Sequence, residues 1–495
     1  MSAQYTDSTI AYASASETLR LLRDGKIGAV ELLQLYNARI ERWNDRLNLV
    51  VARDMDAAMA AARRADAHAG EKGALHGLPM TVKDTWNVTG MATTCGIPAL
   101  ADYRPTEDAA VVRALKEAGA IIFGKTNVPE GAADYQSYNP VFGTSNNPWD
   151  ESRCVGGSSG GSAAALAAGF TPVEVGSDLA GSIRVPAHFC GVYGHKPSFG
   201  VVSLAGHIPV MPGRHEVIDM GVGGPMARSA TDLELMMDLM ISPGPTRTGA
   251  WSPKLPPSRH EELKDFRVAL WLGDHSDYVL DNEYRIAIEQ FVDDLRSAGV
   301  TIDIHARPNF DFNEAFDIYF DALGGVNAGQ LPQDAYDHIL AEAQRLADSD
   351  ELIRKFAKAL VMTHRDHVML SSRRLHLKAL WAQFYERYDI FLSPVSNSPA
   401  FPHDHSHTDL GMLGHLLRTT QIDNRPCNYA VRYQWPSIAN AAELPSTVMP
   451  TRRLVGGLPV GIQAQGPFLE DRTTLRFAQL VERELGGFMP PPGFN

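Results

Sequence analysis

The sequence predicts an α/β fold, a single large domain in which a twisted mixed β-sheet is flanked on both faces by α-helices. Short apolar segments alternate with helical ones, as in the order strand 78–84, helix 109–119 and strand 120–127. Strand-like segments also occur on both sides of the proline-rich stretch 242–266, which favours a surface connection within one domain. The composition, 44% hydrophobic and 21% charged, is typical of a globular protein.

The remaining elements follow from apolar periodicity and stop signals. Residues 14–70 predict helices, at 15–25, 29–44 and 55–70, with glycines ending the first and third. Beyond 120–127 we expect a buried strand at 173–178 and, after the proline-rich stretch, strand 267–273, helix 282–299 and strand 301–307. Residues 312–388 are expected to be mainly helical, and strands are expected at 389–395 and 457–467.

Charge and composition exclude several classes of partner. The formal net charge of −13 would repel nucleic acid and anionic membranes. No window approaches the run of about 18 apolar residues that a membrane span needs, and residues 1–20 do not have the pattern of a secretory signal. The cysteines are widely spaced, which indicates free thiols in a reducing cytoplasm: Cys95, Cys154, Cys190 and Cys427.

Two glycine- and serine-rich segments stand out as candidates for chemistry, GGSSGG at 156–161 and GSDLAGSIRVP at 176–186. A serine hydroxyl needs a base, yet the chain has no recognisable histidine triad motif and no GxSxG elbow of the kind used by α/β hydrolases. Lys83, at the end of an apolar strand, is a candidate base if burial lowers its pKa; the alternative is a lysine leaving the sheet. Small residues before Ser182 would let backbone N–H groups converge as an oxyanion hole.

Other interpretations of the same segments remain open at this point. The loop before Ser182 also fits a phosphate-binding or simple packing turn. Nucleotide binding at the GGSSGG segment is disfavoured, because neither the Walker spacing nor a clean strand–GxGxxG–helix occurs in that segment.

The two segments together resemble the signature of the amidase signature hydrolases. The resemblance continues in order through GLPMTVKD, GKTNVPE, NPVFGTSNNPWD, GPMARS, DIFLSPV and GLPVGIQAQG. It is dense from about residue 75 to 230 and returns after about 385. The resemblance implies one amidase signature domain over 1–495, with an N-terminal helical segment 1–70, a catalytic core about 71–240, a variable, mainly helical substrate segment about 245–385 and a C-terminal core segment about 386–495.

The resemblance also implies a Ser–cis-Ser–Lys triad. In this sequence Lys83 is the base, Ser158 the bridging serine after a cis peptide bond, and Ser182 the nucleophile. The backbone N–H groups implied for the oxyanion hole are those of Leu179, Ala180, Gly181 and Ser182. Asp178 and Arg184 are expected to brace this loop, and Ala132 and Ser158 to contact substrate. The chain departs from the family at Ala180, where a glycine is common. No cofactor and no metal are expected.

The implied activity is hydrolysis of the C–N bond of a small linear amide, an arylamide or a carbamate among them, through an acyl-enzyme. The expected partners are this small molecule and a second copy of the chain. Two alternatives stay open: a component of an amidotransferase complex that releases ammonia from an amide, and a non-catalytic binding protein on the same scaffold. The stretch YFDALGGVNAGQL lacks the glycine- and tyrosine-rich character expected of the amidotransferase component.

Other chemically suggestive residues are expected to be structural. The run HDHSH at 403–407 resembles a metal cluster, but no second set of ligands lies near it in the sequence. Cys95 is expected to be a small buried side chain and Lys125 a structural lysine. Three aromatic residues between 138 and 149 are expected to pack rather than bind ligand: Tyr138, Phe142 and Trp149.

Overall fold

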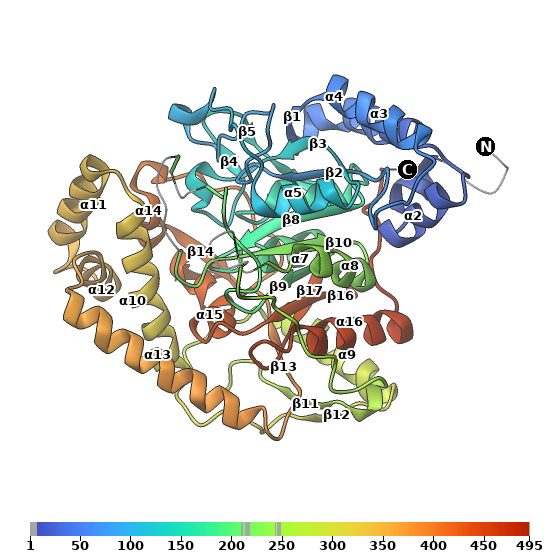
Figure 1. Cartoon of the computed structure of the whole chain (residues 1–495). Helices are drawn as coiled ribbons and strands as arrows, with labels where there is room; N and C mark the ends of the chain where they lie inside the picture. Colours follow the sequence, from blue (N-terminus) through green and yellow to red (C-terminus); the bar gives the residue numbers. More distant parts are fainter. Residues whose placement is uncertain (1–6, 209–210, 213–217, 243, 245–248, 495) are drawn as a thin grey trace.

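The structure is a computed structural model, and it describes residues 7–208, 211–212, 218–242, 244 and 249–494 (Figure 1). The strands of the main sheet are β8 (Val173–Asp178), β9 (Tyr193–Lys196), β10 (Val222–Ala227), β11 (Arg267–Leu270), β12 (Thr301–Asp303), β13 (Ile390–Pro394), β16 (Ser446–Val455) and β17 (Leu458–Gln465). Within the described residues they form one eight-stranded sheet in the order β12-β11-β13-β17-β16-β9-β10-β8. β11 pairs in parallel with β12 and β13, and the other neighbours pair antiparallel, so the predicted mixed α/β sheet is confirmed.

A smaller sheet carries the lysine strand. It contains β1 (Val50–Arg53), β2 (Pro79–Lys83) and β3 (Ile121–Thr126), in the order β1-β3-β2. The predicted strands 78–84 and 120–127 pair in parallel here. β2 also lies against β8, because Trp86 Nε1, just beyond β2, donates to the carbonyl oxygen of Val175 at 3.1 Å. The end of β2 is therefore brought beside the end of β8.

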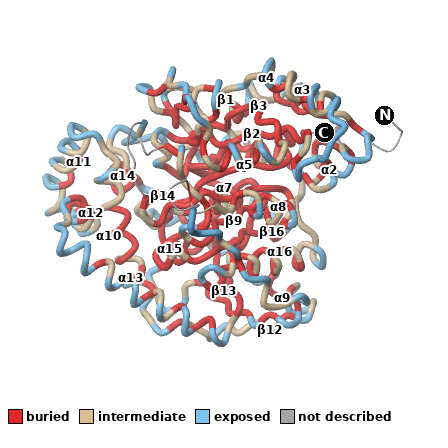
Figure 2. The backbone as a smooth tube through the Cα atoms, in the orientation of Figure 1, coloured by how far each residue is buried: buried red, intermediate tan, exposed pale blue. Residues whose placement is uncertain are grey.

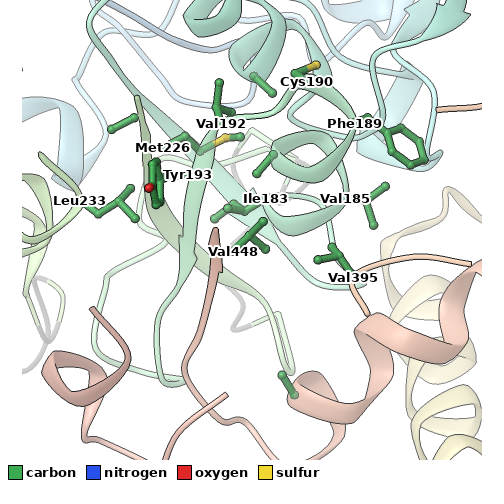
Figure 3. Packing of buried hydrophobic residues seen from close by; sticks show 14 of the residues in the cluster. Ile183, Val185, Phe189, Cys190, Val192, Tyr193, Met226, Leu233, Val395 and Val448 are labelled. Carbon is green, nitrogen blue, oxygen red and sulfur yellow. The ribbon is translucent and has the colours of Figure 1, made fainter. Parts of the chain in front are cut away.

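Helices cover the main sheet on both sides. The α-helices of the described chain are α1 (Asp7–Tyr12), α2 (Ala15–Arg23), α3 (Ala29–Leu47), α4 (Met55–Ala67), α5 (Ala110–Glu117), α6 (Gly160–Ala167), α7 (Arg184–Cys190), α8 (Ala230–Met240), α9 (Asn282–Ser297), α10 (Phe312–Gln330), α11 (Gln333–Leu346), α12 (Glu351–Leu360), α13 (His364–Phe384), α14 (Gly411–Leu417), α15 (Gln434–Ala441) and α16 (Asp471–Leu485). Thr447 of β16 donates to Thr474 of α16, whereas its neighbour Val448 lies among Ile183 and Val185 near α7 (Figure 3). Successive strand residues face opposite sides, so α16 and α7 cover opposite faces.

Polar side chains set several helix starts. The hydroxyl of Ser14 accepts a hydrogen bond from Glu17 N at the start of α2. α13 begins at a capping box between Thr363 and Asp366. α10 to α13 run along one side of the molecule and confirm that residues 312–388 are mainly helical (Figure 1).

Three short hairpins complete the described chain. They are β4 (Tyr138–Asn139) with β5 (Gly143–Thr144), β6 (Asn146–Asn147) with β7 (Asp150–Cys154), and β14 (Thr419–Ile422) with β15 (Arg425–Asn428). Hairpins β4–β5 and β6–β7 lie in the segment that leads to the glycine- and serine-rich turn 156–161.

Among the described residues, one continuous apolar core extends from Ile10 to Phe494. Figure 2 shows that buried residues are concentrated in the middle of the molecule. The chain ends meet at this core, because the hydroxyl of Tyr12 donates to the carbonyl oxygen of Phe494 at 3.0 Å. α6 is buried along its whole length and consists only of Gly, Ser, Ala and Leu, which lets the neighbouring backbone approach closely. Among the described residues, no helix combines the length and apolar character needed to cross a membrane.

Candidate active site

Lys83 ends β2 and is fully buried. Its Nζ lies 2.7 Å from the Oγ of Ser158 and 2.9 Å from the Oγ of Ser177. Burial lowers the pKa of Lys83 to about 7, although nearby acidic groups act to raise it. An uncharged amine in this position can accept a proton from a hydroxyl group. The sequence left two interpretations of this lysine, a buried base or a charged residue leaving the sheet. In the structure the lysine is buried.

The turn between β7 and α6 directs Ser158 at this lysine. The peptide bond from Gly157 to Ser158 is cis, as the resemblance implies. A side chain at Gly157 would place its Cβ only 2.1 Å from the carbonyl oxygen of Asp134, so close packing requires glycine here. The backbone N–H of Ser159 donates to the carbonyl oxygen of Ser182 at 3.0 Å. The two serine-bearing segments are thus hydrogen-bonded to each other beside Lys83.

A buried carboxylate organises the loop that carries Ser182. Asp178, the last residue of β8, accepts hydrogen bonds from the backbone N–H groups of Gly181 at 2.8 Å and Ile183 at 3.1 Å. Burial by itself would raise the pKa of Asp178, but the guanidinium of Arg184 and these hydrogen bonds hold it below its usual range. The carboxylate therefore stays charged and keeps the loop folded around it.

Arg184 links the same loop to the C-terminal part of the chain. Its Nε and Nη2 each lie 3.0 Å from an oxygen of Asp178. Its Nη1 donates to the carbonyl oxygen of Pro436 and to Oε1 of Gln463, both at 3.0 Å, and its Nη2 also bonds Asn440. All these groups are in β17, α15 or the loop, so residues about 250 positions apart are joined at the nucleophile loop. This is the bracing arrangement that the resemblance implies.

The structure differs from expectation at one of the four predicted oxyanion donors. The N–H of Gly181 is directed at Asp178, so it is already bonded and cannot serve as a free donor. Among the described residues, no hydrogen-bond partner is found for the N–H groups of Leu179, Ala180 and Ser182. Gly181 instead serves the loop through its backbone conformation, since its φ is +102° and a Cβ would lie 2.7 Å from Pro436.

Ala180, the departure from the common glycine, is accommodated without backbone strain, because it is not among the described non-glycine residues with positive φ. The hydroxyl of Tyr135 donates to its carbonyl oxygen. The ring of Tyr135 lies 5.0 Å from that of Tyr433, measured between centroids. An aromatic wall that the sequence did not reveal therefore adjoins the Ser182 loop.

Ala132 lies in a short turn, Glu130–Ala132, with a φ of +58°. It packs against the small apolar cluster formed by Cys95, Leu100 and Ile208. The turn is tied to the segment that follows β2, since Gly131 N donates to the carbonyl oxygen of Cys95 at 2.9 Å. The contact of Ala132 with substrate remains a prediction.

The other candidates are structural in this arrangement. Burial raises the pKa of Cys95 to about 12, which keeps it a neutral thiol. Lys125 forms a buried ion pair with Asp84 at 2.9 Å. In the HDHSH run the ring of His405 stacks on Tyr138, with centroids 3.7 Å apart. Across the described part of the chain, no cluster of three or more His, Cys, Asp or Glu residues could hold a metal ion.

Sequence reasoning missed Ser177 and Tyr135. Ser177 lies within the predicted strand 173–178, one residue before Asp178, and its only signal was a hydroxyl beside a charged residue at the end of a buried strand. Tyr135 precedes the predicted packing residue Tyr138 and has no sequence signal of its own. Both are recognised only because the fold brings them to Lys83 and Ala180.

Comparisons with known proteins identify the family of the chain. The family model described as Amidase matches residues 31–475. A glutamyl-tRNA(Gln) amidotransferase subunit of Aromatoleum aromaticum is 31% identical over 497 residues, covering 95% of this chain and 97% of its own. The crystal structure of an amidase has 28% sequence identity and a TM-score of 0.76, covering 96% of this chain and 100% of that one. A bacterial aryl acylamidase of the amidase signature family, at 20% identity, has a TM-score of 0.77 over 96% of this chain and 97% of its own, which shows likeness of fold. The chain therefore belongs to the Amidase family, the amidase signature hydrolases.

Proposed function

We propose that this hydrolase cleaves the C–N bond of a small linear amide through an acyl-enzyme formed on Ser182. The observation that carries the proposal is the 2.7 Å contact between Nζ of the buried Lys83 and the Oγ of Ser158. A lysine whose pKa is lowered to about 7 is substantially uncharged at neutral pH and can act as a general base. A surface lysine, with an ordinary pKa, could not.

The proposed relay passes protons through two hydroxyl groups. Lys83 takes a proton from Ser158, and Ser158 takes one from Ser182 as the oxygen of Ser182 attacks the carbonyl carbon of the substrate. The developing oxyanion receives hydrogen bonds from the free N–H groups of Leu179, Ala180 and Ser182. Removing one such donor in other hydrolases costs about a hundredfold or more in rate.

Collapse of this intermediate requires a protonated leaving group. The relay runs backwards and delivers the proton to the amide nitrogen, so that a neutral amine departs and the acyl group remains as an ester on Ser182. A water molecule, deprotonated by the same relay, then attacks the ester and releases a carboxylic acid. A carbamate would follow the same steps, and its acid product would lose carbon dioxide. No step needs a metal or an organic cofactor.

The aromatic side chains beside the loop support an arylamide or an aryl carbamate as the substrate class. Tyr135 bonds the carbonyl oxygen of Ala180 and its ring adjoins Tyr433, and the ring of His415 stacks on Tyr433 with centroids 5.9 Å apart. Rings of this kind prefer offset or edge contacts with another aromatic group. A p-nitroanilide or a phenyl carbamate offers such a group directly next to the scissile bond.

A second candidate function comes from the relatives. Two proteins that are 31% and 30% identical to this chain are named as parts of a glutamyl-tRNA(Gln) amidotransferase. In that role the same serine would release ammonia from glutamine within a complex. Against this stands the sequence 319–331, YFDALGGVNAGQL, which lacks the expected glycine- and tyrosine-rich stretch.

The decisive experiment uses the purified chain alone. A panel of p-nitroanilide, primary amide, ester, carbamate and glutamine substrates is assayed on the fraction that gel filtration separates from other proteins. Turnover of a small amide or carbamate by this fraction, and its loss in Ser182→Ala, is the expected result. Release of ammonia from glutamine only after partner proteins are added would support the amidotransferase role instead. Failure of a fluorophosphonate to label Ser182 would favour a non-catalytic binding protein.

A further inference from the structure

A second buried titratable group lies close to Lys83 and has no role in the proposed relay. Glu174 of β8 is fully buried. Thr81 Oγ1 lies 2.5 Å from its Oε1, and the backbone N–H of Val175 donates to its Oε2 at 3.1 Å. Within the described residues it forms no ion pair with a lysine, an arginine or a histidine. A buried carboxyl group without a cation is unusual, because its ionised form is costly there.

The carboxyl group of Glu174 contacts the face of β2 that carries the lysine. Thr81 and Lys83 are two residues apart on β2, so their side chains lie on the same face of the strand. Thr81 bonds Glu174 and Lys83 bonds Ser177, both on β8, which shows that this face of β2 is directed towards β8. The ionised carboxylate of Glu174 raises the pKa of Lys83.

Among the described groups that act on Lys83, only Glu174 changes its charge where the lysine titrates. Burial raises the pKa of Cys95 to about 12, so this thiol stays neutral. Asp178 stays ionised beside Arg184, and burial lowers the pKa of His207 so that its ring stays neutral. The pKa of Glu174 itself is raised by burial, to about 7, and so lies in the range where Lys83 titrates.

The groups around Glu174 do not titrate in this range. The carboxyl group is surrounded by the hydroxyl groups of Thr81 from β2, Thr126 from β3 and Ser162 from α6. Thr126 and Ser162 are in turn 2.8 Å apart between their hydroxyl oxygens. The pKa of Glu174 is therefore set by its burial and by these hydrogen bonds, and no acid or base is among these neighbours.

We propose that Glu174 is a positioning residue that controls how much of Lys83 is in its uncharged form. The protonated carboxyl group leaves the amine neutral, and the carboxylate stabilises the ammonium. This inference rests on the proposed function, in which the neutral amine starts the relay.

The first test is the pH dependence of kcat/KM in Glu174→Gln. Glutamine keeps the shape and cannot be ionised, so the anion that favours the ammonium is lost. We expect the midpoint of the acid limb to fall by about one pH unit relative to wild type. Thr81→Val removes a hydrogen bond that lowers the pKa of Glu174, so it should shift the limb in the same direction even if Glu174→Gln folds poorly. An unchanged midpoint in both variants would overturn the inference.

The matched control is Asp232→Asn. Asp232 of α8 is also a fully buried carboxyl group with a raised pKa, but it accepts hydrogen bonds from Ala15 N at 2.7 Å and Ser16 N at 2.9 Å, which are remote from the lysine. Loss of a buried carboxyl group as such would lower stability or kcat in both proteins. Only Glu174→Gln should shift the midpoint of the acid limb of kcat/KM.

A second readout does not depend on activity. Lysines labelled with ¹³C at Cε report their own titration by NMR, and the Lys83 signal is identified by its absence in Lys83→Met. We expect the pKa of Lys83 to be lower in Glu174→Gln than in wild type, by about one unit. A wild-type protein without turnover but with this shift would refute the proposed function and retain the inference. Turnover together with an unchanged pKa of Lys83 in Glu174→Gln would support the proposed function and refute the inference.

Discussion

Replacing Lys83 with methionine is expected to abolish turnover and, at the same time, to stabilise the fold. In wild type the side chain must lose its proton to be buried, because burial lowers its pKa from 10.5 to about 7. One pKa unit corresponds to about 1.4 kcal/mol, so folding near pH 7 carries a penalty of about 5 kcal/mol. Methionine carries no charge and loses hydrogen bonds to Ser158 and Ser177 worth about 1 kcal/mol each. The net gain in the free energy of unfolding is therefore about 3 kcal/mol.

The pH dependence of this gain has a defined sign. The folded-state pKa of Lys83 is below its unfolded-state value, so between about pH 7 and 10.5 the unfolded chain binds the extra proton. Wild-type stability therefore rises with pH in this window by about 1.4 kcal/mol per pH unit. The advantage of Lys83→Met is full below the window and shrinks across it.

Urea unfolding of both proteins, followed by circular dichroism from about pH 7 to about pH 9, measures this difference. Lys196→Met is the matched control, since Lys196 is also buried with a pKa lowered to about 7 by burial, and its Nζ bonds the carbonyl oxygens of Pro197 and Leu444. This control should show a similar pH slope and retain turnover. A Lys83→Met protein that is less stable than wild type at every pH, or a difference that does not vary with pH, would refute the reasoning.

Three further predictions concern the same site. Ser182→Ala should lower turnover at least about ten-thousandfold and change the free energy of unfolding by less than about 0.5 kcal/mol; retained fluorophosphonate labelling would point to another nucleophile. Asp178→Asn should lower the free energy of unfolding by about 3 kcal/mol, because Arg184 stays buried without its anion, and calorimetry showing wild-type stability would contradict the bracing role. In wild type, kcat/KM should rise about tenfold per pH unit below about pH 7 and level off above it, as Lys83 loses its proton; a flat profile from stopped-flow or steady-state assays would exclude this lysine as the base.

Local sequence was sufficient for elements whose side chains repeat with a clear period. The boundaries of β8 agree with the predicted strand 173–178, because a short apolar run that ends in a charged residue is typical of a buried strand. β1 was missed inside the predicted helical region 14–70, since its hydrogen bonds come from β3, more than seventy residues away. The sequence did not predict β10, because its two glycines and its proline are uncommon inside strands. It is a strand because it is paired with β8 along its length.

The sequence by itself determined which side chains carry the chemistry: a lysine ending a strand, serines among glycines, and an aspartate before the loop, all encoded by local spacing. The tertiary structure decided what each of them faces. It added Ser177 and Tyr135, turned the N–H of Gly181 to Asp178, and set Glu174 against Thr81 beside the lysine strand. These contacts join residues on different strands and loops, and their proton affinities depend on burial, which no window of sequence contains.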